Sequence, residues 1–102
     1  MNNPRPAYHA SKAAINNLTK YMAMEFRNSG ITVNAVAPGL THSELDKFLP
    51  PEIEDFVNNE LPTRRWSEAL EIGAACVYLA SPAGAQVNGV VLTVDAGKRL
   101  VD

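Results

Sequence analysis

The sequence predicts an α/β fold in which two parallel strands form part of a doubly wound sheet. Two runs rich in β-branched residues, 31–39 and 90–97, are typical of buried strands. Helical patterns separate these runs, so the connection between them is a crossover that makes the strands parallel. The expected order is helix, strand, short helix, helix, strand, forming one partial domain over residues 1–102.

The first helix is expected over residues 7–28, after an irregular segment at 1–6 that holds two prolines and two asparagines. Apolar residues recur at intervals of three and four and predict one buried stripe, made of Ile15, Leu18, Met22 and Phe26. Gly30 suits the left-handed conformation that often ends a helix. A stripe of this length favours packing against a sheet larger than two strands.

The segment between the two strands is expected to contain two helices. The first strand ends at Pro38-Gly39, and residues 50–61, with Pro51 in the first turn, favour a short helix. Ser67 is the expected N-cap of the next helix. Its inner face is expected to consist of Ala69, Ile72, Cys76 and Leu79, which makes Cys76 a small core residue.

Composition narrows the classes of protein. The 102 residues are 46% hydrophobic and 20% charged, as in soluble globular proteins. A formal net charge of −2 and the lack of a basic run argue against nucleic-acid and membrane partners. The single cysteine excludes an intrachain disulfide, and His9 and His42 lack carboxylate companions at metal-ligand offsets. No leader or membrane-length apolar run is evident, so we expect a cytoplasmic protein with no metal site.

Tyr8 and Lys12 are the candidate catalytic residues. Residues four apart on a helix share one face, so these two side chains are expected to project together. A nearby ammonium stabilises a phenolate and lowers the pKa of a phenol, which makes proton exchange with an alcohol or carbonyl oxygen feasible. The alternative is a tyrosine packed on the core beside a solvated lysine.

Several linked motifs resemble the C-terminal portion of the short-chain dehydrogenases/reductases. The motifs, in order, are YHASKAAINNLTK, GITVNAVAPG, VYLAS and NGVVLTVDAG. The resemblance implies a partial Rossmann-like fold and an NAD(P)(H)-dependent oxidoreductase acting on a small-molecule carbonyl/alcohol pair. By the same resemblance Tyr8 is the proton donor, and Lys12 tunes it and holds the nicotinamide ribose hydroxyls.

The resemblance also implies that Pro38, Gly39, Thr41 and Ser43 bind the cofactor, with the backbone of Thr41 at the nicotinamide carboxamide. Ligands of open α/β sheets bind beyond the carboxyl ends of strands, where these residues lie. The alternative for Thr41 and Ser43 is helix capping ahead of Glu44. Phe48, Phe56 and Trp66 either line an apolar mouth of the substrate loop or pack in the core.

The chain differs from the family pattern mainly because it lacks several of the family's motifs. Its glycines never form the G-x-x-x-G-x-G turn that binds the dinucleotide phosphates, and the residue that selects NAD or NADP is missing as well. The N-terminal half of the fold is therefore expected to be absent, and the isolated chain inactive and marginally stable, with a homo-oligomer covering part of its apolar surface. The substrate is expected to be of the 3-oxoacyl or sugar/polyol kind. The alternative is a catalytically dead remnant that serves at most as an oligomerisation or interaction piece.

Overall fold

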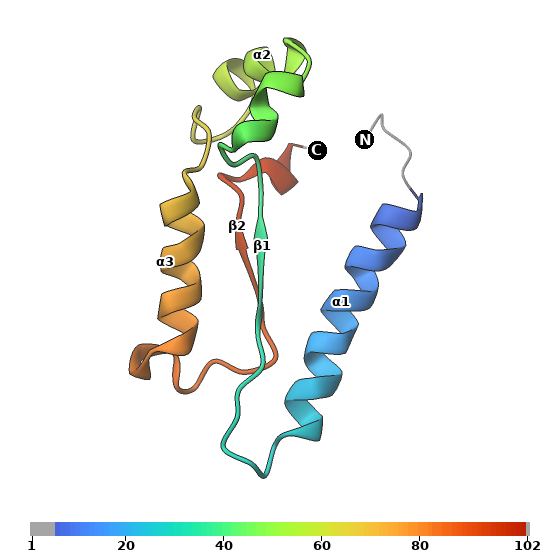
Figure 1. Cartoon of the computed structure of the whole chain (residues 1–102), viewed down its shortest axis with the longest axis vertical. Helices are drawn as coiled ribbons and strands as arrows, with labels where there is room; N and C mark the ends of the chain where they lie inside the picture. Colours follow the sequence, from blue (N-terminus) through green and yellow to red (C-terminus); the bar gives the residue numbers. More distant parts are fainter. Residues whose placement is uncertain (1–5, 102) are drawn as a thin grey trace.

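The computed structural model describes residues 6–101 and confirms the α/β fold class (Figure 1). The expected irregular segment at 1–6 lies outside the described residues except for Pro6, which begins the first helix. Within the described part, no helix is both long enough and apolar enough to cross a membrane. The elements are α1 (Pro6–Glu25), β1 (Ala35–Pro38), the 3-10 helix η1 (Glu44–Phe48), α2 (Glu52–Asn59), α3 (Ala69–Ala80), the short turn η2 (Pro82–Gly84), β2 (Val91–Val94) and η3 (Lys98–Leu100).

The two strands pair in parallel, as expected, with Ala35 opposite Val91 and Pro38 opposite Val94. Both are shorter than the predicted runs, and at their amino-terminal ends side-chain hydrogen bonds are added to the backbone ones. The amide of Asn34 donates to the Val87 carbonyl at 2.9 Å, and its carbonyl oxygen accepts from the Val90 N–H at 3.0 Å. Asn34 therefore joins the segment before β1 to the segment before β2.

Helices α1 and α3 lie on opposite sides of the two strands (Figure 1). Helix α3 packs on both strands, whereas α1 buries only Thr19 and Ala23. The expected apolar stripe of α1 is therefore only partly covered, since Ile15 is 49% and Leu18 52% exposed. Two strands offer too little surface to cover the whole face of a 20-residue helix.

The start of α3 differs from the prediction that Ser67 caps it. The N-cap is Glu68, whose N–H donates to the Glu71 carboxylate at 3.0 Å. Ser67 is instead held in a parallel bridge with Thr41: its N–H donates to the Leu40 carbonyl, and its carbonyl accepts from the His42 N–H, both at 2.9 Å. Because the bridge holds the backbone of Ser67 in extended geometry, the helix begins beyond it.

The best-buried cluster lies beyond the carboxyl ends of the two strands rather than on the face of the sheet (Figure 1). Val57 and Leu61 are each 1% exposed and pack with Trp66, at 9%. Trp66 and the half-buried Phe56 thus belong to the core, whereas Phe48 is 74% exposed. The prediction that Cys76 is a core residue is wrong: its thiol is exposed, because the face of α3 that carries it borders open grooves.

Candidate functional site

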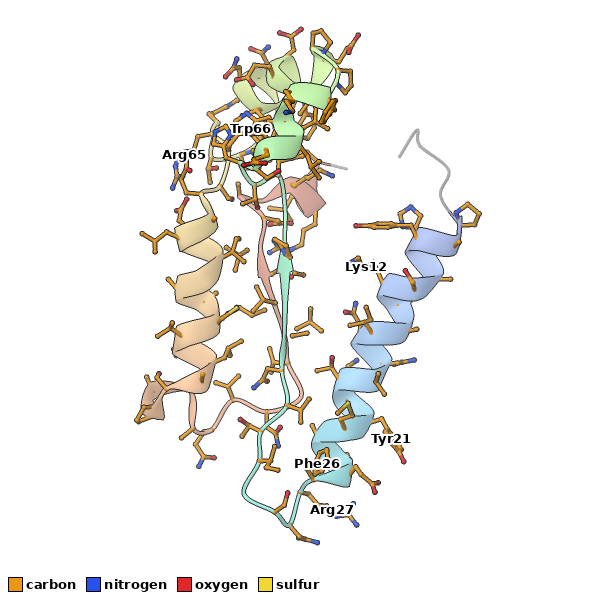
Figure 2. The ribbon with its side chains drawn as sticks, viewed as in Figure 1. Lys12, Tyr21, Phe26, Arg27, Arg65 and Trp66 are labelled. Atoms are coloured by element: carbon orange, nitrogen blue, oxygen red, sulfur yellow. The ribbon has the colours of Figure 1, made fainter. Side chains whose placement is uncertain are left out.

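Tyr8 and Lys12 share one face of α1, as their spacing predicts. The ammonium nitrogen of Lys12 lies over the Tyr8 ring, 5.5 Å from its centroid. Both line a cleft of about 260 Å³ between α1 and β1, which Asn16 also lines and which runs along the whole of β1 as far as Pro38. Figure 2 shows Lys12 on the side of α1 that faces the strands. The alternative interpretation requires the Tyr8 ring to pack in the core. The ring does not, because Tyr8 is 45% exposed.

Gly39 continues the strand pairing past the end of β1, since its N–H donates to the Val94 carbonyl at 3.0 Å. A Cβ at this position would lie 2.7 Å from the Cα and 2.8 Å from the Cβ of Asp95. The backbone after β1 thus touches the backbone after β2. This close approach within the chain requires a glycine, independently of any ligand that the turn binds.

Gly39→Ala is expected to lower the free energy of unfolding by about 1–3 kcal/mol, because its methyl group overpacks against the Asp95 backbone. Urea unfolding followed by the emission of the single tryptophan measures the change. Gly73→Ala is the matched control, since nothing lies within 4 Å of its Cβ position on α3. Equal effects of the two substitutions would show that the contact with Asp95 carries no strain.

Thr41 and Ser43 line a second cleft, of about 480 Å³, on the α3 side of the turn. The hydroxyl of Thr41 donates to the Gly39 carbonyl at 3.2 Å. Ser43 is the N-cap of η1: its hydroxyl accepts from the Leu45 N–H at 3.2 Å, and its own N–H donates to Asp46 at 3.1 Å. The capping role that was the alternative for these residues is therefore present for Ser43 but not for Thr41.

The six candidate residues thus fall into two groups that meet at Pro38. Tyr8, Lys12 and Pro38 line the cleft on the α1 side. Gly39, Thr41 and Ser43 line the cleft on the α3 side, which Pro38 also borders. A ligand that contacts all six has to pass over the carboxyl end of β1, the place where ligands of open α/β sheets bind.

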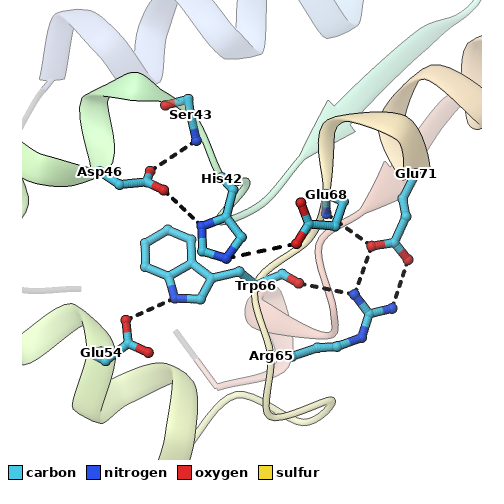
Figure 3. Close-up of polar contacts among 8 residues, drawn as sticks. All are labelled: His42, Ser43, Asp46, Glu54, Arg65, Trp66, Glu68 and Glu71. Carbon is cyan, nitrogen blue, oxygen red and sulfur yellow. Dashed lines mark hydrogen bonds and ion pairs between the residues drawn. The ribbon is translucent and has the colours of Figure 1, made fainter.

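Sequence reasoning missed a polar cluster around His42 (Figure 3). The Nδ1 atom of His42 lies 2.8 Å from the Asp46 carboxylate, and its ring stacks on Trp66 with centroids 4.8 Å apart. The hydrogen bond to Asp46 is the main cause that raises the pKa of His42 above its ordinary value of 6.5. His42 therefore does have a carboxylate companion, and the four-residue spacing to Asp46 was the available signal.

Arg65 and Glu71 hold the first turn of α3 beside this cluster. The guanidinium donates two hydrogen bonds to the carboxylate, at 2.8 and 2.7 Å, and a third to the Trp66 carbonyl at 3.1 Å. The hydrogen bonds from Arg65 lower the pKa of Glu71 to about 2. Glu71 also accepts the N–H of the N-cap residue Glu68, so one carboxylate joins the preceding loop to the helix.

Comparison with known proteins finds relatives that are oxidoreductases. A family model described as enoyl-(acyl carrier protein) reductase matches residues 1–99. The chain is 45% identical over 97 residues to the 2-dehydro-3-deoxy-D-gluconate 5-dehydrogenase of Bacillus subtilis (strain 168), covering 90% of this chain and 37% of that protein. It is 37% identical over 94 residues to the 3-oxoacyl-[acyl-carrier-protein] reductase of Vibrio harveyi, covering 92% and 38%.

Solved structures agree with these relatives. A 4-hydroxyisoleucine dehydrogenase complexed with NADH is similar with a TM-score of 0.84 and 32% identity, over 94% of this chain and 41% of that one. A candidate 2-deoxy-D-gluconate 3-dehydrogenase from Agrobacterium tumefaciens with bound NADP gives 0.88 and 33%, over 98% and 42%. The predicted partial Rossmann-like fold is thereby confirmed.

The extent of these matches decides the assignment. The family model covers nearly the whole chain, whereas the chain spans only 37% to 42% of the length of the relatives compared. Fold and motifs agree with the same family at both ends of the described residues, from α1 to the turn after β2. The chain therefore belongs to the short-chain dehydrogenase/reductase family and corresponds to its C-terminal portion.

Proposed function

We propose that the chain supplies the proton-transfer part of an NAD(P)-dependent oxidoreductase that interconverts a carbonyl and an alcohol. One observation carries the proposal: the Lys12 ammonium lies over the Tyr8 ring, 5.5 Å from its centroid, and both side chains line the cleft between α1 and β1 that reaches Pro38, at the carboxyl end of the strand. A phenol and an ammonium that face one cleft form a proton relay for an oxygen bound there.

The cleft suits the nicotinamide end of the cofactor. The ammonium of Lys12 has donors for ribose hydroxyls, and Pro38 lies at the edge of the same cleft. When bound, the cofactor supplies or accepts the hydride at the substrate carbon. The 102 residues contain no G-x-x-x-G-x-G turn for the diphosphate, so this chain accounts for only one end of the cofactor.

The roles of the two catalytic candidates follow from their chemistry. In reduction, the Tyr8 hydroxyl gives its proton to the carbonyl oxygen, which becomes the alcohol oxygen. In oxidation, the phenolate oxygen takes the proton back from the alcohol. The role proposed for the Lys12 ammonium is to offset the negative charge of the phenolate that each cycle produces, because opposite charges attract.

The substrate is proposed to be a small-molecule carbonyl/alcohol pair of the sugar-acid, polyol or 3-oxoacyl kind. The relatives support this range, since one is a 2-dehydro-3-deoxy-D-gluconate 5-dehydrogenase and another is a 3-oxoacyl-[acyl-carrier-protein] reductase. Either form of the dinucleotide is compatible with the residues of this chain. One solved relative holds NADH and another NADP.

A second candidate function is a non-catalytic interaction piece, and exposed apolar side chains favour it. Leu18, Tyr21 and Met24 on α1 are 52%, 63% and 60% exposed, and Leu70 on α3 is 83% exposed. Faces of this kind suit contact with a second copy or with a complete relative. In this reading residues 1–102 form one partial domain that associates without turning over substrate.

A hybrid enzyme separates the two functions. The segment of the Bacillus subtilis relative that matches this chain is replaced by this chain, and substrate-dependent reduction of the nicotinamide is followed by absorbance. Turnover by a folded hybrid that binds cofactor supports the proposed function. A hybrid that folds and binds NADH or NADPH without any turnover contradicts it and favours the interaction piece.

A further inference from the structure

His42 lies where three segments meet, after the strand β1. Its Nδ1 faces Asp46 of η1 at 2.8 Å, and its Nε2 faces Glu68, the N-cap of α3, at 3.9 Å. One face of its ring stacks on Trp66 with an interplanar angle of 19°. Figure 3 shows the imidazole between the two carboxylates, with the indole against it.

The charged groups that raise the pKa of this imidazole are all carboxylates. Asp46 comes from η1, Glu68 from the start of α3 and Glu54 from α2, and each favours the protonated ring. Glu54 also accepts the Trp66 indole N–H at 3.1 Å, which fixes the plane on which the imidazole stacks. The nearby cation, Arg65, is paired with Glu71 and donates to the Trp66 carbonyl.

The backbone and the side chain of His42 hold different segments of the chain. Its N–H donates to the Ser67 carbonyl at 2.9 Å, so residues 40–42 are joined to the segment before α3 whatever the charge of the ring. The 3-10 helix η1, in contrast, has no buried residue, and its Leu45 is 68% exposed. Among the described residues, the side-chain ion pairs that join η1 to the start of α3 both involve the imidazole of His42.

We propose that His42 is a positioning residue whose imidazolium holds η1 against the start of α3, so that loss of the Nε2 proton breaks the contact with Glu68 and loosens η1 from α3. Ser43, a cofactor-binding candidate, caps η1, and a cleft of about 220 Å³ opens between His42, Trp66 and residues 49–54. Proton loss therefore loosens the segment that borders both this cleft and the one lined by Thr41 and Ser43. The inference concerns the chain itself and does not rest on the proposed reaction.

The direction of the pH dependence follows from linkage. The pKa of His42 in the folded chain is raised above its ordinary 6.5, so the link is fully present below pH 6.5 and is lost as pH rises through the raised value. Protonation also favours the stack, since an imidazolium is attracted to the face of an indole. High salt is expected to weaken the link, because the His42 side chain is 46% exposed.

A titration of the chain tests the inference. The midpoints of His42 and His9 are measured by NMR, protection of the amides of 44–49 is measured by hydrogen exchange, and the emission of Trp66, the only tryptophan, is followed in parallel. We expect His42 to titrate above 6.5 and Trp66 emission to rise with the same midpoint as the stacked cation disappears. Protection of η1 is expected to fall by about tenfold for each pH unit that separates this midpoint from 6.5.

Two variants and a control isolate the charge. Asp46→Asn keeps an oxygen for the Ser43 N–H but removes the charge, and is expected to lower the midpoint of His42 and the protection of η1 at low pH. His42→Gln abolishes the pH dependence of both readouts, whereas His9→Gln leaves it in place. The inference is overturned if wild-type protection of 44–49 is constant through the titration of His42, or if Asp46→Asn leaves the midpoint unchanged.

Discussion

Tyr8→Phe in the hybrid enzyme is expected to lower turnover by about 10²–10⁴-fold, the contribution typical of a general acid or base. The substitution removes the phenolic hydroxyl and keeps the ring over which the Lys12 ammonium lies, 5.5 Å from its centroid. Cofactor affinity is therefore expected to stay nearly unchanged. Steady-state kinetics in both directions, with the affinity for NADH or NADPH measured by fluorescence, separates the two effects.

Tyr21→Phe on the same helix is the matched control. Tyr21 is 63% exposed, and Figure 2 shows it on the side of α1 away from the strands. Its loss of a hydroxyl is expected to leave turnover unchanged. If Tyr8→Phe turns over like the unmodified hybrid, the proton donor lies elsewhere, and the proposed function loses the observation that carries it.

Leu61→Ala is expected to lower the free energy of unfolding by about 2–5 kcal/mol, because the truncation leaves a cavity in the best-buried part of the chain. Leu61 is 1% exposed and packs with Val57 and Trp66. Since small domains are stable by only about 5–15 kcal/mol, the variant is expected to lose a large share of its stability. Thermal or urea unfolding followed by Trp66 emission gives the value.

The control for this change is Leu70→Ala, which makes the same truncation at a side chain that is 83% exposed on α3. Its expected effect is within about 0.5 kcal/mol, as for other surface substitutions. Similar losses at the two leucines would mean that burial at Leu61 does not set stability. The cluster around Trp66 would then not be the main core of the chain.

The features that follow from local periodicity were predictable from the sequence. The shared face of Tyr8 and Lys12 depends only on helical spacing, and the parallel pairing of the two strands depends only on the helices between them. The order of the main elements was predictable for the same reason.

The features that the sequence did not reveal depend on contacts between distant segments. Ser67 is kept out of the helix by a bridge to Thr41. A glycine is required at position 39 because Asp95 comes so close, and no local sequence pattern predicts either contact. The exposure of Cys76 depends on what covers one face of α3. The His42–Asp46 pair was visible as a four-residue spacing, but its stack on Trp66 joins residues 24 apart in the chain.

The weak anchoring of α1 has a consequence for ligand affinity. Tyr8 and Lys12 stand near the N-terminal end of this helix, which diverges from the strands (Figure 1), and α1 buries only Thr19 and Ala23. Local opening is easiest where few side chains are buried, so α1 is expected to alternate between docked and detached states. A ligand of the cleft binds only the docked fraction, and its apparent dissociation constant rises in inverse proportion to that fraction.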